Sequence, residues 1–65
     1  MKVREVIRML EEDGWYQVRQ RVSHRQFKHP AKAGRVTVAG HPSKDLSPAT
    51  LDSVWKQAQI DRPER

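Results

Sequence analysis

The apolar residues of this chain repeat with two different periods, and the order of those periods constrains the fold more than any other feature. Near each end, apolar residues recur every three or four positions, which is the period of one face of a helix. Between these two segments the period shortens to two, which is typical of half-buried strands. The sequence therefore predicts a helix, a group of strands and a second helix.

The two helices have recognisable ends as well as apolar stripes. The first is predicted over 2–13, and Gly14 supplies the left-handed residue that commonly follows a helix. The second is predicted to begin at Ser47, an N-cap residue, followed by Pro48, which is favoured at the first helical position. The apolar positions of the two stripes are Val3, Val6, Ile7 and Leu10, and then Leu51, Val54, Trp55 and Ala58.

Three strands are expected between the helices, over 15–21, 24–28 and 35–39. Val22 and Ser23 form the expected hairpin connection of the first two. Because successive side chains of a strand point to opposite faces, Tyr16 and Val18 of the first strand are expected to point toward the core. The opposite parity defines a sheet face that is expected to stay open, and it carries Gln17, Arg19, Arg21, His24, Gln26, Lys28, Arg35 and Thr37.

Two helical stripes and one sheet face must bury one another. The simplest solution is an α+β fold of order α-β-β-β-α, in which both helices cover one face of a three-stranded antiparallel sheet. A single domain is expected over 1–60, followed by a polar tail over 61–65.

The absence of cysteine suits a reducing cytoplasm and leaves no thiolate for zinc. Without cysteine or clustered carboxylates we expect no metal site, and no motif in the sequence predicts a cofactor. No apolar run approaches the roughly 18 residues of a bilayer-spanning helix, so a membrane is not an expected partner.

The charge of the chain favours a polyanionic partner. The formal net charge is +5 and the isoelectric point is about 10.3, which is typical of proteins that bind nucleic acid or acidic surfaces. The predicted open face carries cations and no acidic residue, whereas a face that is merely solvated usually mixes both signs. Three functions fit this pattern: catalysis on RNA, RNA binding without catalysis, and docking of an acidic protein.

Four segments of the chain, in this order and at this spacing, resemble the HicA toxins, small mRNA interferases of bacterial and archaeal toxin–antitoxin pairs. They are VIRMLEEDGW over 6–15, SHRQFKHP over 23–30, VTVAGH over 36–41, and LSPATL over 46–51 followed by WKQA over 55–58. The resemblance covers about 3–60. It implies a fold like that of double-stranded-RNA-binding domains, in agreement with the order of the periods. It also implies metal-independent cleavage of mRNA, and a HicB-type antitoxin that covers the essential histidine.

The resemblance assigns the essential histidine to His24. The family usually has Gly-Ser-His at this place, whereas this chain has Val22-Ser23-His24. Glycine permits positive φ and a close approach of phosphate to the backbone, and the β-branched side chain of valine resists both. If the turn requires positive φ at Val22, we expect strain there.

The implied chemistry uses His24 as a general acid or base, because imidazole exchanges protons near neutral pH. The 2′-hydroxyl of RNA is the nucleophile, so the expected products are a 2′,3′-cyclic phosphate and a 5′-hydroxyl. The second proton-transfer partner could be Lys28, His29 or water. Arg25 could point toward the helices instead, and Ser23 could serve the turn. The residues expected to contact phosphate are Arg19, Arg21, Ser23, Arg25, Lys28, Arg35 and Lys44.

The remaining aromatic and histidine residues favour structural roles. Trp15 and Trp55 lie on or beside the apolar stripes, and we expect them in the core rather than stacked on bases, because so small a domain needs its large apolar groups for folding. His29 and His41 fall at strand ends. Without cysteine or clustered carboxylates, they do not predict a zinc site.

Overall fold

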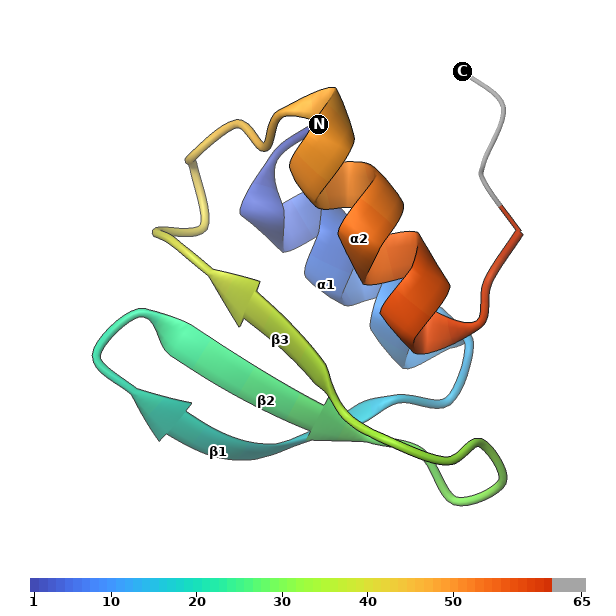
Figure 1. The fold of residues 1–65 in the computed structure, drawn as a ribbon. Coiled ribbons are helices and arrows are strands. Elements are labelled where there is room, and N and C mark those ends of the chain that lie inside the picture. Colours follow the sequence, from blue (N-terminus) through green and yellow to red (C-terminus); the bar gives the residue numbers. More distant parts are fainter. Residues whose placement is uncertain (62–65) are drawn as a thin grey trace.

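The computed structural model describes residues 1–61. Its elements are α1 (Val3–Glu12), β1 (Tyr16–Arg21), β2 (His24–Lys28), β3 (Val36–Ala39) and α2 (Pro48–Ala58). The strands form one antiparallel sheet in the order β1-β2-β3. Both helices lie on the same side of this sheet (Figure 1), so the predicted α-β-β-β-α architecture is confirmed. All of the expected polar tail except Asp61 lies outside the described residues.

The end of α1 depends on Gly14. This residue has φ +104, and the N–H of Trp15 donates to the carbonyl oxygen of Leu10 at 2.9 Å. A Cβ atom on Gly14 would lie 2.8 Å from Nε2 of His29. Glycine is therefore required here both for its backbone conformation and for the close approach of an imidazole.

The start of α2 follows the predicted capping pattern. The hydroxyl of Ser47 accepts a hydrogen bond from the N–H of Thr50 at 3.2 Å, and Pro48 occupies the first helical turn. The helix ends at Ala58 and is capped by Gln59, which has a left-handed backbone with φ 55. Within residues 1–61, neither helix has the length or apolar character needed to cross a bilayer.

The core lies between the two helices and the sheet. Trp15 and Trp55 are both buried in it, which confirms the expectation for these two residues. Ile7 and Leu51, from the predicted stripes, are partly buried and pack against its margin. The buried apolar side chains are Val3, Val6, Leu10, Trp15, Phe27, Val36, Val38, Leu46, Val54, Trp55 and Ala58.

A register shift at Val18 in β1 corrects part of the predicted sheet faces. Gln17 pairs with Phe27, which is fully buried under the helices, whereas Tyr16 pairs with Lys28. Directly paired residues share a face of the sheet, so Gln17 lies on the helix side and Tyr16 on the open face, the reverse of the prediction. The reason is the extra residue of a β-bulge, which reverses the alternation before it. Gln17 is nevertheless exposed to solvent on its side of the sheet. Val18 is itself 42% exposed, so the prediction that it points to the core is also wrong.

Candidate nucleic-acid interface

The open face of the sheet is built from cross-strand pairs. The strand β2 supplies the central row, with His24, Gln26 and Lys28 on the face away from the buried Phe27. The outer strands supply the residues paired with this row. They are Arg21 and Ala39 beside His24, Arg19 and Thr37 beside Gln26, and Tyr16 beside Lys28.

A hollow of ≈ 280 Å³ opens in the middle of this face. Its lining combines guanidinium, imidazole, carboxamide and hydroxyl groups from all three strands, and His24 is exposed to solvent within it. Such groups can bind the oxygens of a phosphodiester and exchange a proton with it. The lining residues are Arg19, Arg21, His24, Gln26 and Thr37.

Arg35 reaches the margin of the hollow from the residue before β3. Its Nη1 donates to Oε1 of Gln26 at 2.8 Å. A guanidinium can only donate, so the oxygen end of the Gln26 carboxamide must face Arg35. The contact therefore fixes the orientation of one polar group in the hollow and adds a cation beside it.

The β1–β2 turn has the strain that the sequence predicts for valine. Val22 has φ 57 and is 87% exposed, and Ser23 does not share the positive φ. A positive φ at the first turn residue alone is the pattern of a type II′ turn, which favours glycine there. The side chain of Gln20 donates to the carbonyl oxygen of Val22 at 3.1 Å, and the carbonyl oxygen of Ser23 accepts from the N–H of Gly40 at 3.1 Å. These bonds hold the turn in place next to His24.

Of the seven expected phosphate-binding residues, Arg19 and Arg21 line the hollow, and the other five do not: Ser23, Arg25, Lys28, Arg35 and Lys44. Arg25 is on the helix side of the sheet, paired with Val38, and its Nη1 donates to the carbonyl oxygen of Gly40 at 2.9 Å. Lys44 lines a different cavity of ≈ 390 Å³ between β3 and the start of α2. The hollow thus brings together Arg19 and Arg21 with the imidazole, while Arg25 and Lys44 serve other parts of the structure.

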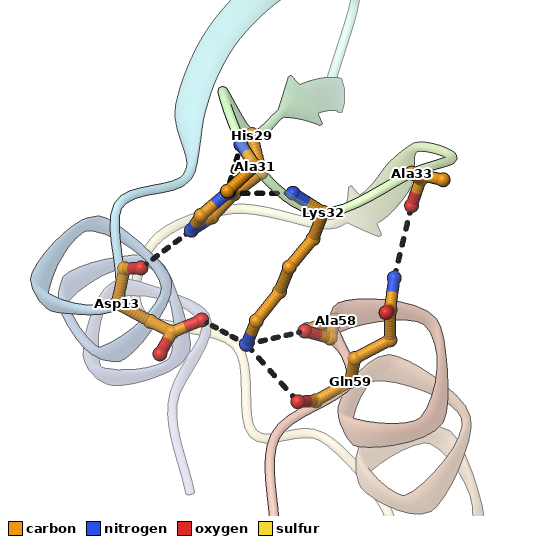
Figure 2. A network of polar contacts seen from close by, with 7 residues as sticks. All are labelled: Asp13, His29, Ala31, Lys32, Ala33, Ala58 and Gln59. Atoms are coloured by element: carbon orange, nitrogen blue, oxygen red, sulfur yellow. Dashed lines mark hydrogen bonds and ion pairs between the residues drawn. The ribbon is translucent and has the colours of Figure 1, made fainter.

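His29 does not line the hollow and is held in a polar network at the end of β2 (Figure 2). Its Nδ1 accepts from the backbone N–H groups of Ala31 and Lys32 at 2.9 and 3.0 Å. Its Nε2 lies 2.7 Å from the carbonyl oxygen of Asp13, which only accepts, so this nitrogen carries the proton. Both ring nitrogens of His29 are therefore engaged in holding the fold.

Lys32 completes the same network. Its ammonium donates to the Asp13 carboxylate at 2.6 Å and to the carbonyl oxygens of Ala58 and Gln59 at 3.3 and 3.0 Å. The hydrogen bond from Lys32 is the main reason that the pKa of Asp13 is lowered from its ordinary value. Figure 2 shows that these contacts join the ends of α1 and α2 to the loop after β2. The ammonium of Lys32 is thus engaged in contacts within the protein.

The charges of the chain are segregated along the sequence. All eight acidic residues lie within 1–13 or 45–65, and 14–44, which contains the whole sheet, has none. The cations of this middle segment are Arg19, Arg21, Arg25, Lys28, Lys32, Arg35 and Lys44. Within the described part of the chain, no three side chains of His, Asp or Glu gather in a way that could hold a metal ion.

Tyr16 is the open-face residue that sequence reasoning missed. It is 51% exposed and lies opposite Lys28. Apolar and polar side chains alternate along 16–19, and no glycine or proline occurs in 16–21, so nothing in the sequence of this strand marks the bulge at Val18. The bulge becomes visible only in the pairing with the neighbouring strand. Gln17 lies opposite the buried Phe27, so Gln17 and not Tyr16 shares the face of Phe27.

Comparison with known protein families matches residues 3–60 to a family described as the HicA toxin of bacterial toxin–antitoxin systems. No curated protein matches the chain. The matched segment includes both helices, the sheet and the hairpin that carries His24, and so contains the whole candidate interface. The resemblance drawn from the four sequence segments is confirmed, and the chain belongs to the HicA family of bacterial toxins.

Proposed function

We propose that this protein is a metal-independent endoribonuclease, an mRNA interferase, whose cleavage of mRNA inhibits translation and growth. Membership of a toxin family supports the general activity. The observation that carries the proposal for this chain is the hollow in which the exposed imidazole of His24 lies opposite Arg21 and shares its lining with Arg19.

In the proposed reaction, the 2′-oxygen of a ribose attacks the adjacent phosphorus, and the bond from phosphorus to the 5′-oxygen breaks. The 2′-hydroxyl loses a proton and the 5′-oxygen gains one, so the products are a 2′,3′-cyclic phosphate and a 5′-hydroxyl. His24 carries out one of these proton transfers as general acid or base. Arg19 and Arg21 stabilise the negative charge that grows on the phosphate oxygens.

Solvent water is the proposed partner for the other proton transfer. His29 already uses both ring nitrogens in the network at the end of β2. Lys28 is four residues from His24 on the same strand, a separation of about 13 Å at ~3.3 Å per residue. A single phosphodiester in contact with His24 therefore lies far from Lys28, whose role we assign to binding a neighbouring phosphate.

We further propose that a HicB-type antitoxin covers His24 and the open face. A toxin of this family implies an antitoxin partner, and the absence of acidic residues from 14–44 favours a partner that offers carboxylates to Arg19, Arg21 and Lys28. Both the mRNA and the antitoxin would meet the protein in the cytoplasm.

The experiment that tests the proposal compares the purified protein with H24A and, as a matched control, H41A. His41 is also exposed but lies in the loop after β3. We expect H24A to cleave RNA about 10²- to 10⁴-fold more slowly, the usual contribution of a general acid or base, while its RNA affinity is largely retained. H41A should cleave like the wild type, and only H24A should relieve growth arrest in cells.

Other outcomes identify the alternatives. Equal cleavage by H24A and the wild type would remove His24 from the mechanism. RNA binding without cleavage by any variant would indicate a non-catalytic RNA-binding module of the same fold. Undetectable binding even at low salt, where phosphate contacts are strongest, would favour a domain that docks an acidic protein.

A further inference from the structure

The single tyrosine of the chain occupies an unusual place on the sheet. Tyr16 is 51% exposed, whereas both tryptophans and the single phenylalanine are buried. Tyr16 lies on the open face because it pairs with Lys28. The bulge at Val18 allows both Tyr16 and Arg19 to lie on this face. The aromatic ring is therefore presented on the same face as the hollow that holds His24.

The neighbours of Tyr16 are cationic. Lys28 is directly opposite, and the next open-face residue along β1 is Arg19, which lines the hollow. No carboxylate occurs anywhere in 14–44. An exposed aromatic ring beside cations that face a polyanion is the arrangement with which proteins bind single-stranded nucleic acid, where the ring stacks on a base and the cations contact the phosphates.

The distance along the sheet also suits a single strand of RNA. Tyr16 pairs with the residue four positions after His24 on β2, which places the two side chains about 13 Å apart at ~3.3 Å per residue. Stacked nucleotides advance about 3.4 Å each, so this separation corresponds to about four nucleotides. One strand can therefore place a linkage at His24 and a base at Tyr16 at the same time.

We propose that Tyr16 is a base-stacking residue that binds an unpaired nucleotide of the RNA a few positions from the linkage cut at His24. Lys28 contacts a phosphate next to that nucleotide. The inference rests on the proposed function in that the ligand is RNA on the open face, but it concerns binding and not the chemical step. It implies that the substrate is single-stranded at this nucleotide, since a paired base cannot leave its stack to cover the ring without an added energetic cost.

The uniqueness of Tyr16 makes the proposal testable by site-specific labelling. In the H24A protein, 3-fluorotyrosine introduces one fluorine reporter in the whole chain, because there is one tyrosine. The probes are a short single-stranded oligoribonucleotide of mixed sequence and a base-free ribose-phosphate chain of the same length. We expect the oligoribonucleotide to shift the fluorine resonance and the base-free chain to leave it nearly unchanged, although both bind the cations.

Affinities measured with variants complete the test. Y16A, made in the H24A background, should bind the oligoribonucleotide about 5- to 150-fold more weakly, the range expected for loss of one stacked base. It should bind the base-free chain equally well. Y16F, which keeps the ring, should bind like the parent, and Y16L, which keeps apolar bulk without a π-face, should resemble Y16A. Thermal unfolding of each variant separates a binding defect from a folding defect.

Three results would overturn the proposal. One is equal affinity of Y16A and Y16F for the oligoribonucleotide. Another is a fluorine shift of the same size with the base-free chain. The third is a loss of affinity in Y16A that affects a protein partner and not RNA, which would make Tyr16 a protein-docking residue.

The failure of this proposal can be told apart from the failure of the proposed catalysis. A protein that binds RNA through Tyr16 but never cleaves it would contradict the proposed catalysis alone. Cleavage that depends on His24 but not on Tyr16 would contradict the stacking proposal alone.

Discussion

At the scale of single residues, Val22 is the position where the sequence and its backbone conflict. A left-handed backbone costs a residue with a side chain about 1–2 kcal/mol relative to glycine, and Val22 adopts it with φ 57 at an 87% exposed position. The side chain thus gains little burial in exchange for this strain. The strain lies two residues from His24, in the turn that positions it.

We predict that V22G stabilises the protein. Relief of the backbone strain outweighs the greater chain entropy that glycine has when unfolded, about 0.5–1 kcal/mol, so the free energy of unfolding should rise by about 0.5–1 kcal/mol. The measurement is urea or thermal unfolding followed by circular dichroism. V18G is the matched control, because Val18 is an exposed valine of the same strand region with no positive φ, and it should be destabilised. A less stable V22G would show that the turn is not strained.

At the scale of elements, the network around His29 and Lys32 connects parts that the sequence separates widely. The ammonium of Lys32 contacts the end of α1 through Asp13 and the end of α2 through two carbonyl oxygens. The ring of His29 contacts the end of α1 and the loop after β2. Each helix end has carbonyl groups without partners inside the helix, and these side chains satisfy some of them.

This network should make the free energy of unfolding fall at acid pH. The hydrogen bond from Lys32 lowers the pKa of Asp13 below the ordinary value of 3.8. A carboxyl group whose pKa is lower in the folded state stabilises the fold above its unfolded pKa, and this contribution is lost as the pH falls through the folded pKa. We therefore predict that D13N loses stability at neutral pH and shows a shallower decline of stability below pH 3.8 than the wild type.

Urea unfolding at a series of pH values measures this effect. E12Q is the matched control, since Glu12 is an exposed acidic residue one position earlier, and it should reproduce the wild-type acid profile. Identical acid profiles for D13N and the wild type would mean that Lys32 does not act through Asp13.

The elements also show how far sequence patterns reach. The helices were predictable because each combines an apolar stripe with a local end signal: Gly14 after α1, and Ser47 with Pro48 before α2. The face of β1 was not predictable, because its residues are compatible with either register and the choice is made by pairing with Phe27 in β2. Arg19, Arg21 and His24, which follow the bulge, accordingly lie on the face where they were predicted. Tyr16, which precedes the bulge, lies on the face opposite to its prediction.

At the scale of the whole molecule, the two layers carry different charge. The sheet segment 14–44 has no acidic residue, and the segments that contain the helices hold all eight. A bound polyanion is therefore attracted to the open face and not to the helices, and its binding must depend on salt because counterions are released.

We predict that the logarithm of the RNA affinity falls with the logarithm of salt concentration at a slope of about −3, if Arg19, Arg21, Lys28 and Arg35 each neutralise a phosphate at about −0.7 per contact for single strands. R21Q should make this slope shallower by about 0.7. R8Q removes an exposed cation from α1 and should leave it unchanged. Equal slopes for the two variants would show that the sheet does not provide the phosphate contacts.

The most direct test of the central claim, that RNA lies on the uncovered face of the sheet, is a map of the backbone amide resonances of the H24A protein as a single-stranded oligoribonucleotide is added. We predict that the perturbed amides cluster at Arg19, Arg21, Gln26, Thr37 and residue 24, around the hollow. Perturbations confined to the outer surfaces of α1 and α2, with the sheet unchanged, would contradict it.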